Sequence, residues 1–196
     1  MAANLVETIQ KNLGYPELRK IDPNTQVVKD EKTSIDPQHL GQAAIPAVLL
    51  GLYKYGSTEQ GSDNLLHGNT STSWLDLFFT DKKEEVISKV ASYSGVSNEN
   101  ASNNMEQIAS EAVKIIGQQT PDDASFTNVK SYVSQQRSDI LLYLPAELQI
   151  GSIMNDNILD DRTNKMEGPM SSTMRFIENL FSGSTTEKNE VGQGDK

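Results

Sequence analysis

Residues 43–53, with the sequence AAIPAVLLGLY, form the longest run without a charged or strongly polar side chain. The preceding Asp36-Pro37 is a strong helix start, because Asp accepts hydrogen bonds from free amides and Pro tolerates the first helical position. The pair predicts a helix over residues 37–56. Its apolar side chains would point in all directions, which is typical of a buried helix. We therefore expect a fold built around one central helix.

Three residues qualify the prediction for this helix. Pro46 lies in its interior, where it removes a backbone hydrogen bond, so we expect a kink or two shorter helices that meet there. Gly41 and Gly51 have no side chain, so another helix could approach the backbone closely at those turns. The run is also too short to cross a bilayer, which takes about 20 residues.

Apolar residues recur at helical spacing in most of the remaining chain. Each group defines one face of a predicted helix. The four groups are Leu5, Val6, Ile9 and Leu13; Val86, Ile87, Val90 and Ala91; Ala101, Met105, Ile108, Ala109, Ala112, Val113 and Ile116; and Phe126, Val129, Tyr132, Val133, Ile140, Leu141 and Leu144.

Capping residues predict where these helices begin and end. Gly14 and Gly95 suit the left-handed position after a helix, and Ser97 suits the N-cap of the next one. Ser57-Thr58-Glu59-Gln60 has the form of a capping box, which predicts a short helix to Leu66. Asp81-Lys82-Lys83-Glu84 is interpreted as another cap. Gly117 is expected to end the helix before it, and Thr120-Pro121 to start the following one.

The last part of the chain is interpreted in the same way. Residues 74–79 are brief and apolar, and we interpret them as helix because no partner strand is evident. A helix is predicted from Pro145 to about Met154, with Leu148, Ile153 and Met154 as its inner face, and a last helix begins at Pro169. The prediction is a single all-α domain over residues 1–181, a bundle of about seven to nine helices, with a disordered tail at 182–196.

Charge and composition exclude several classes of function. The chain has 17 basic and 27 acidic residues and a formal charge of −10, which argues against binding to nucleic acid or to anionic membranes. It has no cysteine, so disulfides, thiol nucleophiles and Cys-ligated zinc are excluded. The first residues show no signal-peptide pattern, and we expect a cytoplasmic protein.

The motifs of common enzymes are absent. The sequence contains no P-loop, no dinucleotide-binding G-x-G-x-x-G, no G-x-S-x-G and no H-E-x-x-H. His39 and His67 both lie at predicted helix ends, where histidines are usually hydrated or bonded locally. We therefore predict a protein without catalytic residues or cofactor, and not an enzyme.

The loop at residues 155–168 is rich in oxygen ligands. Its carboxylates are Asp156, Asp160, Asp161 and Glu167, and such groups suit a hard cation. The spacing does not fit an EF-hand, and Arg162 and Lys165 supply ion-pair partners within the loop. We interpret the loop as held by Asx turns and ion pairs, with a divalent-cation site as the alternative.

The predicted last helix has a wide apolar face. Met170, Met174, Phe176 and Leu180 are candidate interface residues, together with Ile177 and Phe181. The arc of about 160° exceeds the 100° of a helix that faces a core. A contact with a partner protein or with a second copy is one interpretation. The other is that the arc lies in a groove between two helices of the same chain.

The stretch IDPQHLGQAAIPAVLLGLYKYGSTEQG, with the helix pair around Tyr93-Ser94-Gly95-Val96-Ser97, resembles a family of uncharacterised bacterial proteins related to YidB. The shared pattern is an N-terminal helix, an A-x-P-A-h-L-x-G-L-like helix (h apolar) and a later s-G-v-s helix–turn–helix. The resemblance covers residues 1–120. It implies an all-helical bacterial protein of unknown function, with no catalytic residues to carry over.

Three functions agree with these patterns. The first is a non-enzymatic acidic helical protein that acts as an interaction or scaffold module. The alternative is a regulator that binds a small ligand or a divalent cation through residues 155–168. The third, a hydrolase with paired carboxylates, requires acids that converge in one pocket, which a sequence cannot show.

Overall fold

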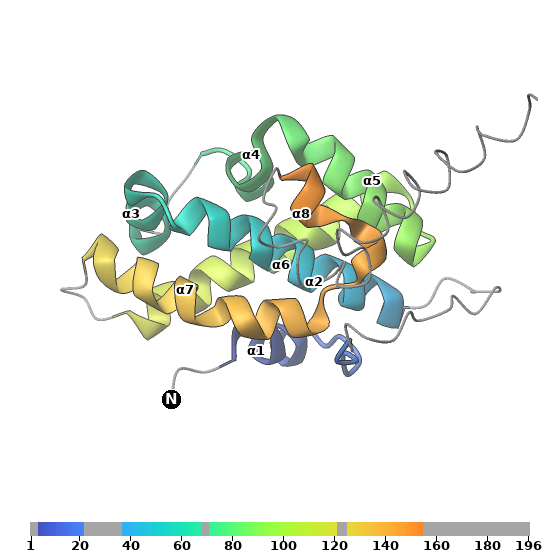
Figure 1. Ribbon diagram of the computed structural model, residues 1–196, viewed down its shortest axis with the longest axis horizontal. Coiled ribbons are helices and arrows are strands. Elements are labelled where there is room, and N and C mark those ends of the chain that lie inside the picture. The colour runs from blue at the N-terminus through green and yellow to red at the C-terminus, as the bar shows by residue number, and fades with distance from the viewer. Residues whose placement is uncertain (1–3, 22–36, 68–70, 121–124, 155–196) are drawn as a thin grey trace, which may run out of the picture.

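The computed structural model describes residues 4–21, 37–67, 71–120 and 125–154 (Figure 1). The regular structure of these residues is helical and includes no strand, which confirms the predicted all-α bundle. None of the described helices is long and apolar enough to cross a membrane. The elements are α1 (Leu5–Asn12), α2 (Pro37–Gly56), α3 (Glu59–His67), α4 (Trp74–Phe79), η1 (Thr80–Lys82), α5 (Lys83–Ser94), α6 (Asn98–Gln119), α7 (Phe126–Tyr143), η2 (Ala146–Leu148) and α8 (Ile150–Ile153).

Helix α2 is the centre of the bundle. It packs against α1, α3, α4, α5, α6 and α7, and Figure 1 shows it running through the middle of the molecule. Every residue from Leu40 to Leu52 is buried, as the apolar sequence predicts. α2 is one continuous helix through Pro46, so the alternative of two shorter helices is wrong. Packing on all sides holds the helix together where Pro46 removes a hydrogen bond.

Gly41 and Gly51 of α2 lie under aromatic rings. A Cβ at Gly51 would lie 2.7 Å from the ring of Phe79 on α4, and a Cβ at Gly41 would lie 2.9 Å from the ring of Tyr15. The predicted close approach of another helix is confirmed at Gly51, where the neighbour is a side chain of α4. At Gly41 the neighbour is Tyr15, which follows α1 and lies in no helix.

Several predicted helix ends are confirmed. Gly14 and Gly95 have φ of 72° and 69°, and the Ser97 side chain accepts a hydrogen bond from the Asn100 amide. The Asn4 cap of α1 was not predicted. Residues 74–79 form α4, as expected.

Other predicted ends are wrong by one or two residues. Thr58, not Ser57, caps α3, because its Oγ1 accepts from the Gly61 amide at 3.0 Å. α5 begins at Lys83, and Asp81 lies in η1 without capping it. α6 continues past Gly117 to Gln119, since nothing crowds Gly117 and Thr120 bonds back to the Ile116 carbonyl.

The start of α7 also differs from the prediction. Pro121 lies outside the described residues, and α7 begins at Phe126, where the Ser125 amide donates to Asn128 Oδ1 at 2.9 Å. The spacing predicts Phe126 on the apolar face, but its side chain is 41% exposed because it precedes the first buried turn of the helix.

The single helix predicted over residues 145–154 is divided in two. Gln149 adopts a left-handed conformation with φ of 51°, which ends η2 and starts α8. The predicted inner face is nevertheless confirmed, because Leu148, Ile153 and Met154 are buried.

Two buried glutamines fix the connecting segments to the bundle. Gln42 of α2 accepts from the Arg19 amide at 2.8 Å and donates to the carbonyls of Arg19 and Tyr143 at 3.1 and 2.7 Å. Gln136 of α7 accepts from the Leu5 amide at 2.9 Å. These bonds satisfy backbone groups that no helix ladder pairs. They hold the start of the chain against α2 and α7.

Candidate interaction surface

A groove of about 650 Å³ lies along the outer face of α6, beside the end of α1. The α6 residues that line it recur at three- and four-residue spacing, on the side opposite the buried face of the same helix. The lining residues are Leu13, Asn103, Glu106, Gln107, Ser110, Glu111 and Lys114.

The Glu106 carboxylate binds the residues at the start of α4. Its carboxylate accepts hydrogen bonds from Ser73 Oγ at 2.7 Å, from the Trp74 amide at 2.8 Å and from the Leu75 amide at 3.3 Å. The first amides of a helix have no partner within it, and a negative charge there is favourable. The N-cap residue of α4, Ser73, makes no side-chain capping bond, so Glu106 of α6 caps this helix instead.

The Glu111 carboxylate binds the end of α1. One carboxylate oxygen accepts from Asn12 Nδ2 at 2.8 Å, and the other pairs with Lys114 Nζ at 3.2 Å. The Glu111 side chain is only 13% exposed. The two carboxylates of the groove thus hold helices in place.

The remaining polar groups of the groove are uncharged and exposed. The side chains of Asn103, Gln107 and Ser110 have no hydrogen-bond partner within the described ranges. Leu13 adds a half-buried apolar side chain at the edge. This arrangement offers donors, acceptors and an apolar contact, so it suits binding better than proton transfer.

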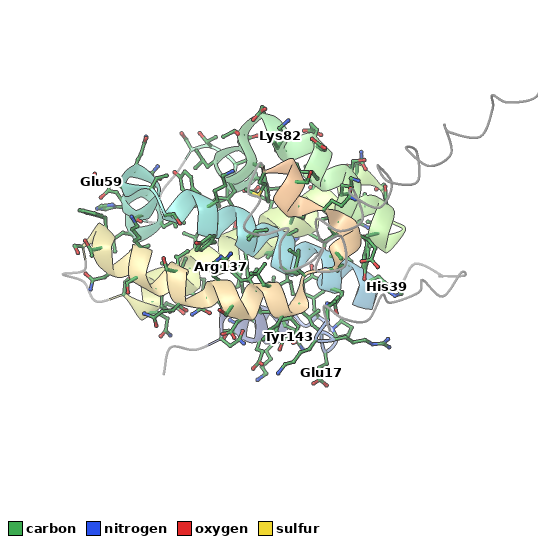
Figure 2. All side chains as sticks on the ribbon, viewed as in Figure 1. Glu17, His39, Glu59, Lys82, Arg137 and Tyr143 are labelled. Atoms are coloured by element: carbon green, nitrogen blue, oxygen red, sulfur yellow. The ribbon has the colours of Figure 1, made fainter. Side chains whose placement is uncertain are left out.

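A second, smaller recess of about 390 Å³ lies between α3 and the start of α7. Glu59, Gln60, Asp63 and the exposed ring of Phe126 line it, and Figure 2 shows Glu59 at one end of the molecule. Asp63 is also 3.6 Å from Nδ1 of His67.

The two histidines do not share a site. His39 lies at the end of the molecule opposite Glu59 and packs edge-on against Tyr93, with ring centroids 6.3 Å apart (Figure 2). His67 ends α3, where its Nδ1 lies 2.8 Å from the Asp63 carbonyl oxygen. In the part of the chain that the structure describes, no group of three or more His, Asp or Glu side chains is arranged to hold a metal ion.

Burial raises the pKa of several tyrosine hydroxyls. Burial raises the pKa of Tyr93, and Glu147 adds to the rise while Arg19 opposes it. Burial also raises the pKa of Tyr132, whose hydroxyl has no hydrogen-bond partner among the described residues.

The site residues predicted from sequence lie outside the described ranges. This applies to the cation candidates Asp156, Asp160, Asp161 and Glu167, and to the interface candidates Met170, Met174, Phe176 and Leu180. The α6 groove was not predicted. Its spacing of Asn103, Gln107, Ser110 and Lys114 is visible in the sequence, but every amphipathic helix has such a polar face.

Comparison with protein-family models gives no match, and comparisons with curated proteins and with solved structures give no significant match. The resemblance to the YidB-like family therefore remains a prediction.

Proposed function

We propose that this chain is a non-enzymatic, acidic helical interaction module and that the α6 groove binds a segment of a partner protein. One observation carries the proposal. The groove's carboxylates, Glu106 and Glu111, are used to position α4 and α1, while Asn103, Gln107 and Ser110 remain available.

Amide and hydroxyl side chains suit a peptide partner. Each Asn or Gln side chain offers both a donor and an acceptor, which matches the N–H and C=O groups of a polypeptide backbone. The formal charge of −10 disfavours nucleic acid and anionic lipid as alternatives. The partner is thus a protein, which includes a second copy of the chain, and we propose that they meet in the cytoplasm.

The apolar stripe of Met170, Met174, Phe176 and Leu180 remains a proposed second contact for the same partner. The stripe lies outside the described residues, so no contact or distance of its side chains supports this proposal. The alternative function, cation binding by residues 155–168, also lies outside them, and no described feature favours it.

The test blocks the groove in the full chain. Gln107→Arg with Ser110→Arg fills the groove with two long charged side chains, and we expect at least a tenfold loss of retained partner when the chain is immobilised in an extract of its native cells. Quantitative mass spectrometry of the retained proteins, with size-exclusion chromatography for self-association, measures the effect.

Ser131→Arg with Ser134→Arg is the matched control, because it adds the same charge to the exposed face of α7. Retention by this variant should change less than twofold. Equal loss in both variants, or a wild-type chain that is monomeric and retains nothing specific, contradicts the proposal.

A further inference from the structure

The described chain ends in two very short helical elements. Ala146–Leu148 forms η2 and Ile150–Ile153 forms α8, with Gln149 between them at φ of 51°. Few backbone bonds lie within them, among them those from the Ile153 amide to the Gln149 carbonyl at 3.1 Å and from the Met154 amide to the Ile150 carbonyl at 2.9 Å. Such short elements depend on contacts with the rest of the bundle.

Those contacts are mainly with α5. The side chains of Ile150, Ile153 and Met154 are buried, and α8 lies beside α5 in Figure 1. Residues 149–154 are therefore held to the bundle by three buried apolar side chains. α2, by contrast, packs against six other helices.

One charged side chain holds the end of this segment. Lys54, an exposed residue of α2, donates a hydrogen bond from Nζ to the carbonyl oxygen of Met154. Lys54 forms no ion pair with a described carboxylate. A cation at the last carbonyl of a helix satisfies a group that has no partner within the helix.

We infer that residues 149–154 form a flap that opens from α5 while the rest of the bundle stays folded, with Gln149 as its hinge and Lys54 as its latch. Opening breaks the contacts of three apolar side chains and one hydrogen bond, whereas global unfolding breaks the whole core. Opening also releases Gln149 from a left-handed conformation, which is unfavourable for a residue with a Cβ.

The flap is a conformational device separate from the α6 groove. When it is closed, Met154 is held at Lys54 of α2 and α8 packs against α5. When it is open, Ile150, Ile153 and Met154 are exposed together with the α5 surface that they cover. The Lys54 contact thus controls the exposure of this apolar surface.

Amide hydrogen exchange of the full chain, read by NMR, tests the inference. In the wild type, the Ile153 and Met154 amides should exchange at least about a hundredfold faster than the Leu49 and Leu50 amides of α2, after correction for intrinsic rates. Lys54→Gln removes the cation and should accelerate the Ile153 and Met154 amides a further fivefold or so, without changing those of α2.

Two variants serve as controls. Lys54→Arg keeps a cationic donor and should stay within twofold of the wild type, and Lys114→Gln removes a different exposed lysine and should leave α8 unchanged. The inference of a flap is wrong if the Ile153 and Met154 amides of the wild type exchange as slowly as those of α2. The role of Lys54 as the latch is wrong if the Ile153 and Met154 amides exchange at the same rate in Lys54→Gln and in Lys54→Arg.

Discussion

Two tyrosines of α7 place their hydroxyl groups in contrasting surroundings. Tyr132 Oη is buried without a partner among the described residues, whereas Tyr143 Oη donates to Glu7 Oε1 at 3.3 Å. A buried polar group without a hydrogen bond costs roughly 1–3 kcal/mol relative to a paired one. The Tyr132 hydroxyl is therefore a source of instability, whereas the Tyr143 hydroxyl is not.

Tyr132→Phe should therefore stabilise the protein, by about 1 kcal/mol at neutral pH. The gain should grow above pH 10. Burial raises the pKa of Tyr132 in the folded state, so the unfolded tyrosine loses its proton first, and the wild type loses more stability than the Phe variant as pH rises. Urea unfolding at pH 7 and pH 10.5 measures both effects.

Tyr143→Phe is the matched control for this prediction. It removes a hydroxyl that has a partner, so it should cost about 0.5–1 kcal/mol instead of giving a gain. A loss of stability in Tyr132→Phe as large as that in Tyr143→Phe would show that the Tyr132 hydroxyl is satisfied in solution.

Helix α2 depends on the absence of a side chain at Gly51. A Cβ there would lie 2.7 Å from the ring of Phe79, which is itself buried and has little room to move. Gly51→Ala should therefore cost about 1–3 kcal/mol, as overpacking does in other cores. Urea unfolding measures the change in free energy.

Gly117 of α6 is the control, because it is also helical but a Cβ added there would meet no described atom within 4 Å. Gly117→Ala should stabilise the protein by about 0.5–1 kcal/mol, since Ala is the better helix former. If both alanines stabilise the protein, Gly51 does not mark a close contact.

The helices were predictable from local patterns, but their anchoring was not. The apolar positions of α1, α5 and α6 and the caps at Ser97 and Gly95 follow from spacing and from residues next to each helix end. The cap of α4 comes from Glu106, on another helix, and the anchor of the first segment comes from Gln42, within an apolar helix. Such long-range bonds leave no local signal in the sequence.

The α6 groove also could not be predicted from local patterns, because two helices that are distant in the sequence form it. Neither the polar face of α6 nor the end of α1 is unusual alone, and the groove exists because the two pack side by side through Asn12 and Glu111. The sequence predicted a buried central helix, which is confirmed, because burial on all sides requires an apolar pattern that a sequence displays directly.

The α6 groove is the surface through which we propose that this protein meets a partner. Site-specific photo-crosslinking in the native cells tests this proposal, with a benzophenone side chain in place of Ser110 in the groove or Ser134 on the exposed face of α7. We expect a dominant crosslinked protein from position 110 that is absent from position 134. Identical products from both positions, or none from position 110, would contradict it.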